Sequence, residues 1–170
     1  MEIAVIGGGH GCHAAAADLS ERGHRVRLWR RDREAFAPIL ERSALTLTDS
    51  QGTRDVNLEL ATTDLSQAVT GAELVLIPLP ATAQVVLGRE LAPLLTDGQV
   101  VFLPPGTFGS YILADAVKRA GTGARVTFAE TGTLPYLARK QATDHIAIRV
   151  RATRLPTGVL PTLDWSRALD

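Results

Sequence analysis

The chain has 170 residues and carries 18 basic and 18 acidic side chains, so its formal net charge is zero. This balance argues against a nucleic acid or an anionic membrane as the main partner. The length and a hydrophobic fraction of 45% suit one globular domain, and a single cysteine excludes an internal disulfide and a cysteine-based metal cluster. No signal peptide precedes the first predicted strand and no apolar run approaches 18 residues, so we expect a cytoplasmic protein. Because the single cysteine supplies no metal cluster, we expect no metal ion.

The first predicted strand, Ile3 to Ile6, leads into three glycines and then into an alanine-rich helix from His10 to Arg22. A glycine cluster between a strand and a helix is typical of dinucleotide-binding proteins. Gly7 suits the tight turn, and Gly9 lets the backbone approach a pyrophosphate at the positive end of the helix dipole. The third glycine of the usual fingerprint falls on Cys12, although Gly11 is beside it. The alternative is a turn with a structural role only. The cofactor-binding residues predicted in this segment are Gly7, Gly8, Gly9, His10, Gly11 and Cys12.

The rest of the chain alternates short apolar runs with helical segments, which indicates repeated strand–helix units. The predicted strands are 24–29, two antiparallel strands within 45–60, a buried strand at 73–79, then 99–103 and 125–129. The predicted helices are 31–42, 65–69 with Asp64 as its cap, 81–95 and 107–120. In 145–151 apolar and polar residues alternate, which predicts an edge strand with one face in water. Together these elements predict one dinucleotide-binding domain over residues 1–170, an α/β doubly wound (Rossmann-type) fold. Its mainly parallel sheet carries helices on both faces and an antiparallel edge strand.

Ligands of such sheets bind at the carboxyl ends of the strands, where the strand order reverses. The turns that follow the later parallel strands are therefore candidates for contact with the cofactor. Proline and glycine in these turns are also explained by turn chemistry alone, which is the alternative interpretation. The cofactor-binding residues predicted in these turns are Leu79, Pro80, Thr82, Pro105, Gly106, Glu130 and Thr131.

The end of the second strand usually distinguishes the two nicotinamide cofactors. An acidic side chain there accepts hydrogen bonds from the adenosine ribose, whereas an arginine accommodates a 2′-phosphate. Here Arg30 and Arg31 follow the strand, and arginine pairs with phosphate through charge-assisted bonds. We therefore expect NADP(H) as the preferred cofactor, and Asp32 keeps NAD(H) open as the alternative.

Four segments of the chain carry a resemblance to a known family. They are V-I-G-G-G-H-G at the start, I-P-L-P-A-T-A-Q at 77–84, V-V-F-L-P-P-G-T-F-G-S at 100–110 and, the most specific of them, A-E-T-G-T-L-P-Y-L-A-R at 129–139. In these segments the chain resembles the octopine/nopaline (opine) dehydrogenases. Cys12 and His10 depart from the family, which usually has glycine and asparagine there. The enzymes for glycerol-3-phosphate and ketopantoate share the first half of the chain but match 129–139 poorly.

The resemblance implies an NAD(P)-dependent oxidoreductase acting on CH–NH bonds, which condenses an amino acid with a 2-oxo acid. In that family a second, mostly helical domain supplies the catalytic histidine, and we expect the chain to end where that domain would begin. The catalytic residues therefore stay unknown, and we expect the isolated chain to be inactive. We expect it to associate with a second domain or chain, or with another copy of itself. A non-catalytic cofactor-binding module is one alternative, and a small dehydrogenase that completes its site by dimerisation is another. The substrate-side candidates are Thr133 and Tyr136. We also expect Leu134, Pro135 and Tyr136 to form an exposed apolar patch on which the second domain or chain docks.

Overall fold

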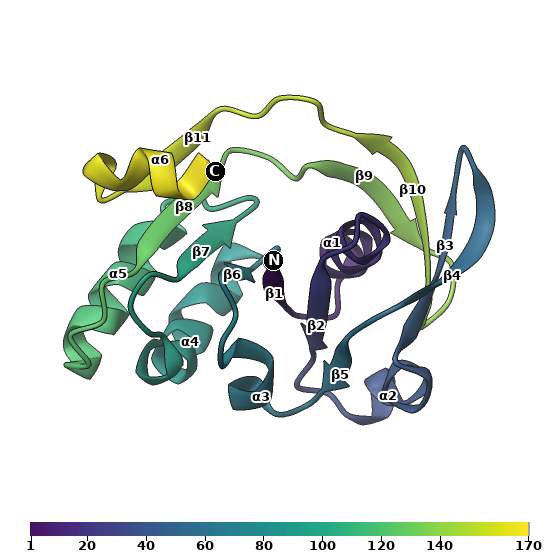
Figure 1. Cartoon of the computed structure of the whole chain (residues 1–170), viewed down its shortest axis with the longest axis horizontal. Coiled ribbons are helices and arrows are strands. Elements are labelled where there is room, and N and C mark those ends of the chain that lie inside the picture. The colour runs from purple at the N-terminus through teal and green to yellow at the C-terminus, as the bar shows by residue number, and fades with distance from the viewer. Residues whose placement is uncertain (170) are drawn as a thin grey trace.

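The computed structural model describes residues 1–169, with side chains to residue 168, and contains two sheets with a helix between them. The main sheet has seven strands in the order β11-β8-β7-β6-β1-β2-β5 (Figure 1). All neighbours pair in parallel except β11, which runs antiparallel to β8 at one edge. The strands are β1 (Glu2–Ile6), β2 (Arg25–Trp29), β5 (Leu60–Thr62), β6 (Leu74–Leu76), β7 (Val100–Leu103), β8 (Thr127–Thr131) and β11 (Thr157–Leu160).

Helices cover both faces of the main sheet. The helices are α1 (His10–Glu21), α2 (Ala37–Arg42), α3 (Leu65–Val69), α4 (Ala81–Leu91), α5 (Gly109–Ala120) and α6 (Trp165–Leu169), with 3₁₀ turns at Glu34–Phe36, Ala92–Leu94 and Thr162–Asp164. Alternate residues of β1 point into different cores, because successive side chains of a strand face opposite sides. Ile3 and Val5 pack with α1, whereas Ala4 and Ile6 pack with α3, α4 and α5. The predicted doubly wound α/β fold is therefore confirmed.

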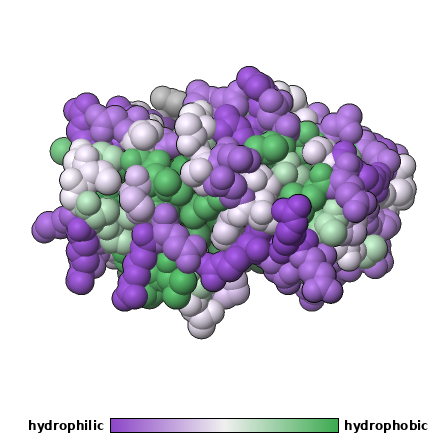
Figure 2. Space-filling view, turned by 90° about the horizontal axis from the view of Figure 1, so that it is seen from below, coloured by the Kyte–Doolittle hydropathy of each residue, from purple (hydrophilic) through white to green (hydrophobic). Residues whose placement is uncertain are grey.

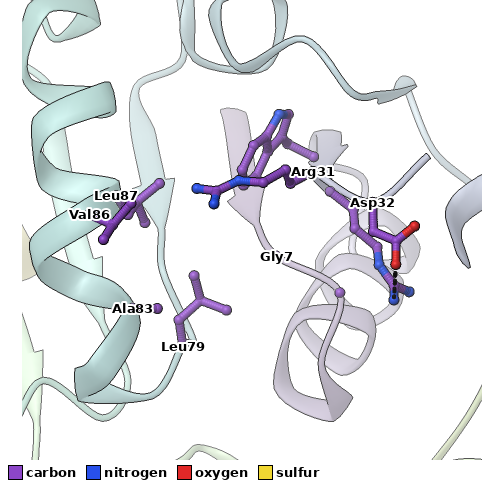
Figure 3. A pocket seen from close by; sticks show the side chains of 10 residues that line it. Gly7, Arg31, Asp32, Leu79, Ala83, Val86 and Leu87 are labelled. Carbon is purple, nitrogen blue, oxygen red and sulfur yellow. Dashed lines mark ion pairs between the residues drawn. The ribbon is translucent and has the colours of Figure 1, made fainter. Parts of the chain in front are cut away.

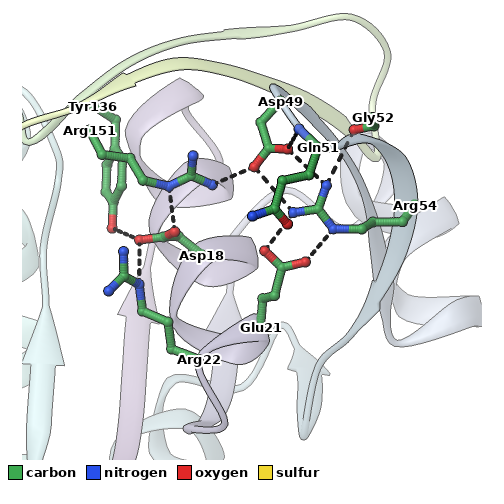
Figure 4. A network of polar contacts seen from close by, with 9 residues as sticks. All are labelled: Asp18, Glu21, Arg22, Asp49, Gln51, Gly52, Arg54, Tyr136 and Arg151. Atoms are coloured by element: carbon green, nitrogen blue, oxygen red, sulfur yellow. Dashed lines mark hydrogen bonds and ion pairs between the residues drawn. The ribbon is translucent and has the colours of Figure 1, made fainter.

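A second sheet covers the outer side of α1. It has the order β4-β3-β10-β9, with β3 (Ala44–Asp49), β4 (Gly52–Asn57), β9 (Tyr136–Lys140) and β10 (His145–Arg151). Helix α1 lies between this sheet and the main sheet (Figure 1). Leu45, Leu47 and Ile146 of the second sheet are fully buried against the alanines of α1. A network of ion pairs adds polar contacts between the same two layers (Figure 4).

Three predicted elements need correction. Strand β10 is not an edge strand, because it pairs with β3 on one side and with β9 on the other. Its register shifts between Ile148 and Val150, so Val150 is exposed against the predicted alternation. Ala147, before the shift, is buried although it was predicted to face water. The second strand predicted within 45–60 ends at Asn57, and Leu60 starts a separate strand that joins the main sheet. The run predicted at 73–79 forms a strand only at Leu74–Leu76.

The strand order reverses between β1 and β6, which are neighbours in the sheet. From β1 the chain moves to β2 on one side, and from β6 it moves to β7 and β8 on the other. The carboxyl ends of β1 and β6 therefore bound the crevice in which ligands of such sheets bind. None of the described helices is long and apolar enough to cross a membrane.

Candidate cofactor-binding site

The turn after β1 depends on Gly7. Its φ is +122°, a conformation that side-chain-bearing residues rarely adopt, and its N–H donates to the carbonyl of Trp29 at 2.8 Å. A Cβ at this position would lie 2.5 Å from the Leu79 side chain and 2.8 Å from Cys12 Sγ. Glycine at position 7 thus lets the loops after β1 and β6 approach each other.

Gly9 leaves open space at the start of α1. Its backbone is extended, with φ −80° and ψ 179°, and a Cβ there would meet no atom within 4 Å. The first N–H groups of a helix have no partners within the helix, and they carry the positive end of its dipole. An anionic group can therefore approach the backbone at Gly9, as the pyrophosphate of a dinucleotide requires.

Close packing of α1 on the crevice involves Gly11 as well as position 12. A Cβ at Gly11 would lie 3.1 Å from Leu134 and 3.2 Å from Pro78. Cys12 is fully buried, with its Sγ 3.6 Å from the Ile6 carbonyl oxygen. Burial raises the pKa of the Cys12 thiol to about 11, so the side chain is an inert packing group. Gly11 therefore meets a need for a small residue beside the buried Cys12.

A cleft of about 390 Å³ opens between the end of β2 and helix α4 (Figure 3). One wall is apolar, and Arg31 crosses the cleft toward α4, where its guanidinium donates to both carboxylate oxygens of Glu90 at 3.1 Å. This ion pair is exposed, since the Arg31 side chain keeps 63% of its accessible surface. Sequence reasoning missed Glu90, which carries no local signal beyond being acidic. The cleft is lined by Gly7, Gly8, Trp29, Arg30, Arg31, Asp32, Leu79, Ala83, Val86 and Leu87.

Arg30 lies directly on the glycine turn. A Cβ at Gly8 would lie 2.5 Å from Arg30 Cδ and 2.7 Å from its Nε. The guanidinium donates to the carbonyl of Ala35 at 3.0 Å and lies 3.9 Å from the carboxylate of Asp32. Asp32 also accepts the N–H of Ala35, so its carboxylate holds the turn that follows β2. The structure thus brings Arg30 and Arg31 together with the glycine turn.

The loop after β7 is fixed by Glu130 from β8. The carboxylate accepts the N–H of Phe108 at 3.1 Å, and from Ser110 it accepts the N–H at 3.0 Å and the hydroxyl at 2.9 Å. Thr107 and Phe108 both have positive φ, so this loop is strained for residues with side chains. Sequence reasoning missed Ser110 and the buried Gln84, whose amide donates to the carbonyl of Gly106 at 2.8 Å.

The remaining predicted residues lie at the carboxyl edge or inside the protein. Pro80 and Thr82 are exposed at the start of α4, and Pro105 is partly buried beside Gly106. Thr131 is buried, and its hydroxyl donates to the carbonyl of the exposed Thr133 at 2.7 Å.

The Tyr136 hydroxyl is directed to the middle of α1, and a role of this residue on the substrate side stays a prediction. The hydroxyl donates to Asp18 at 3.1 Å, eight residues and about 12 Å along α1 from His10. Burial raises the pKa of the Tyr136 phenol well above its usual range. The apolar patch expected around residues 134–136 is consequently reduced, and Leu134 is 39% exposed.

The comparisons with known proteins agree with this geometry. The family of the NAD-dependent glycerol-3-phosphate dehydrogenase N-terminus matches residues 2–106. A glycerol-3-phosphate dehydrogenase [NAD(P)+] of Thermoanaerobacter sp. (strain X514) is 36% identical over 84 residues, which are 49% of this chain and 24% of that protein. An opine dehydrogenase of Arthrobacter sp. (strain 1C) is 32% identical over 89 residues, 52% of this chain and 25% of that protein.

Two solved structures share the fold over nearly the whole chain. Octopine dehydrogenase in complex with NADH and agmatine superposes with a TM-score of 0.79 at 20% identity, covering 93% of this chain and 41% of that one. Yersinopine dehydrogenase with bound NADP+ gives 0.71 at 15% identity, covering 99% of this chain and 45% of that one. The resemblance to opine dehydrogenases is confirmed at this level.

The relatives are longer than this chain, which spans about a quarter of the glycerol-3-phosphate dehydrogenase and less than half of octopine dehydrogenase. The family match nevertheless covers β1 to the loop after β7, which is more than half of the chain and includes the glycine turn, both arginines and the cleft. This chain belongs to the family of the NAD-dependent glycerol-3-phosphate dehydrogenase N-terminus.

Proposed function

We propose that the chain binds NADP(H) along the carboxyl edge of its main sheet, as the cofactor-binding part of an opine-dehydrogenase-like oxidoreductase. The observation that carries this proposal is the open backbone at Gly9 beside the two arginines that follow β2. In this arrangement the pyrophosphate lies at the start of α1, and the adenosine lies in the cleft between β2 and α4. Leu79, Val86 and Leu87 offer apolar contacts to the adenine ring.

The preference for NADP(H) over NAD(H) rests on Arg30 and Arg31. The Arg31–Glu90 pair is exposed on both sides, and such pairs are worth about 0.2–1 kcal/mol. A 2′-phosphate, which carries more charge than a carboxylate and accepts bidentate hydrogen bonds, can therefore displace Glu90. Asp32 already accepts the N–H of Ala35 and lies near Arg30, which favours arginine as the cofactor-facing group.

The proposed reaction is the reductive condensation of an amino acid with a 2-oxo acid, for which the bound nicotinamide supplies a hydride. The protein must add a proton donor and groups that hold the substrate carboxylates. Among the described residues, each of the four histidines has another role. His10 accepts the N–H of Lys140, His13 is buried, His24 contacts the N-terminus and His145 contacts Thr48. We therefore propose that the catalytic groups come from a second domain or chain, with Thr133 on the substrate side.

A second candidate is oxidoreduction of glycerol 3-phosphate. The family match and the glycerol-3-phosphate dehydrogenases at 36–40% identity favour it. The two candidates share the cofactor site and differ in the substrate. No catalytic group has been assigned among the described residues, so the site described above does not distinguish the two substrates. Cytoplasmic location and an oligomeric state remain predictions.

Two assays test the proposal. Fluorescence titration with NADPH and NADH tests cofactor binding, and preference for NADPH is expected. Turnover is then measured in two ways, as NADPH oxidation with pyruvate and a panel of amino acids including arginine, and as NADP+ or NAD+ reduction with glycerol 3-phosphate. Each assay is run with the chain alone and within the longest polypeptide that its gene encodes. Opine formation only by the longer polypeptide supports the proposal. Oxidation of glycerol 3-phosphate selects the second candidate. Opine formation by the chain alone shows that the chain holds its own catalytic group.

A further inference from the structure

Lys140 links the second sheet to the glycine turn. It is the last residue of β9, and its Nζ donates to the carbonyl of Gly8 at 3.4 Å. Its backbone N–H donates to Nδ1 of His10, the first residue of α1, at 2.9 Å. The end of β9 is therefore held against the start of α1, and the ammonium group is directed toward the turn.

Lys140 has no ion-pair partner among residues 1–168, whereas Arg30 and Arg31 each have an acidic neighbour. The charge of Asp144 favours the ammonium form of Lys140, but less than the charge of Arg30 opposes it, and the Asp144 carboxylate is paired with Arg42 at 2.6 Å. Partial burial lowers the pKa of the Lys140 amine, and the charge of Arg30 lowers it further. A partly desolvated ammonium beside an arginine, with a carbonyl as its contact, is a place where an anion gains free energy by binding.

Arg30 and Lys140 converge on the same residue from two different sheets. Arg30 follows β2 and lies against the Cα of Gly8, while Lys140 reaches the carbonyl of Gly8 from β9. The pyrophosphate position is one residue further, at Gly9. The end of β2 is where the adenosine ribose lies in proteins of this fold, so the two cations at Gly8 belong to the ribose rather than to the pyrophosphate.

We infer that Lys140 binds the adenosine 2′-phosphate of NADP(H), and that together with Arg30 it forms a two-cation clamp across Gly8. This inference rests on the proposed function and adds the second sheet to the cofactor site. Phosphate supplies the missing counter-charge for Lys140, and lysine binds phosphate as a point charge beside a bidentate arginine. The free ribose hydroxyl of NAD(H) offers no such charge.

Substitution of Lys140 provides the first test. Lys140→Met keeps the aliphatic stem and removes the charge, and Lys140→Arg keeps the charge. Lys118→Met, on the exposed face of α5, is the matched control for the loss of a lysine. Loss of a charge-assisted contact predicts that Lys140→Met weakens NADPH binding about 10- to 100-fold while NADH binding changes less than about twofold. Lys140→Arg and Lys118→Met should both stay close to the unmodified protein.

A footprint on the unmodified protein provides the second test, which needs no variant to fold. Acetylation of lysines by a limiting acylating reagent is followed by mass spectrometry with 2′,5′-ADP or 5′-AMP present. The inference predicts that 2′,5′-ADP protects Lys140 and leaves Lys118 unchanged, and that 5′-AMP protects neither. Equal loss of NADPH and NADH affinity in Lys140→Met, or equal protection by the two nucleotides, would show that Lys140 does not contact the 2′-phosphate. Either result would overturn the inference and leave the proposed binding of the cofactor intact. If the unmodified protein binds neither cofactor, the proposed function fails and the inference fails with it.

Discussion

The carboxylate of Asp18 on α1 accepts the Nε–H of Arg151 on β10 at 2.6 Å, across 133 residues of sequence (Figure 4). Arg151 also pairs with Asp49 of β3 at 2.8 Å, and the Tyr136 hydroxyl donates to Asp18. Hydrogen bonds from Arg54 hold the pKa of Asp49 well below its usual range. This network fastens the second sheet to α1, and it includes Tyr136, the first residue of the strand that ends at Lys140.

Removal of Arg151 should destabilise the protein. The Asp18 and Asp49 side chains are only 8% and 3% exposed, so Arg151→Met leaves two buried carboxylates with fewer partners. We expect a loss of about 2–3 kcal/mol in the free energy of unfolding by urea. The control is Arg119→Met in the exposed pair with Asp115, which should cost less than about 0.5 kcal/mol. Equal losses in the two variants would mean that the network adds little stability.

Gly9 and Gly7 should respond differently to substitution. Gly9→Val adds a side chain to open space in an extended conformation, so the fold should persist while a pyrophosphate is excluded. We expect either cofactor to bind at least about 100-fold more weakly, with a circular dichroism spectrum like that of the unmodified protein. Gly7→Ala forces a Cβ onto Leu79 at positive φ, and should instead lower the free energy of unfolding by about 1–3 kcal/mol. Normal cofactor binding by a folded Gly9→Val would exclude this turn as the pyrophosphate site.

Glu90 should compete with the cofactor for Arg31. Glu90→Gln removes the carboxylate that Arg31 contacts at 3.1 Å, and this should tighten NADPH binding about two- to fivefold. Arg31→Ala should weaken NADPH binding about 10- to 100-fold and leave NADH binding nearly unchanged. Isothermal titration of both variants with both cofactors provides the measurement. Weaker NADPH binding in Glu90→Gln would show that the ion pair shapes the site instead of competing with it.

His13 should make the stability of the fold depend on pH. Burial lowers its pKa to about 4 from an ordinary 6.5, and the charges of Lys140 and Arg30 act in the same direction. Between these values the unfolded chain binds a proton that the folded protein does not. Stability should therefore be complete above about pH 6.5 and fall by up to about 3 kcal/mol as the pH is lowered to about 4. Urea unfolding of His13→Gln at pH 7.5 and 5 should lack most of this difference, and an unchanged pH dependence in the variant would contradict the assignment.

Strands β1, β2, β6, β7 and β8 of the main sheet were predictable because each is a short, largely apolar or alternating run next to glycine, proline or a helix, which are local signals. Strand β11 was not predicted, and the start of β5 was assigned to the preceding strand, which belongs to the second sheet. The second sheet was not predictable, because β3 pairs with β10 across about 100 residues and no local period reports that partner. The same limit applies within the site. Arg30 follows a recognisable strand, whereas Lys140 reaches Gly8 only through the packing of β9 on α1. The close contacts at Gly11 were not predictable either, because they come from the distant Pro78 and Leu134.

Arg30 and Arg31, beside the open glycine turn, are the residues that we propose select NADP(H). The most direct measurement is a pair of fluorescence titrations of the unmodified chain, with NADPH and with NADH, repeated on Arg30→Ala. We expect NADPH to bind at least about 10-fold more tightly than NADH to the unmodified chain, and the ratio of the two affinities to fall about 10- to 100-fold in Arg30→Ala. Equal affinities for the two cofactors in the unmodified chain, or an affinity ratio that does not change when Arg30 is lost, would contradict the proposed selection of NADP(H).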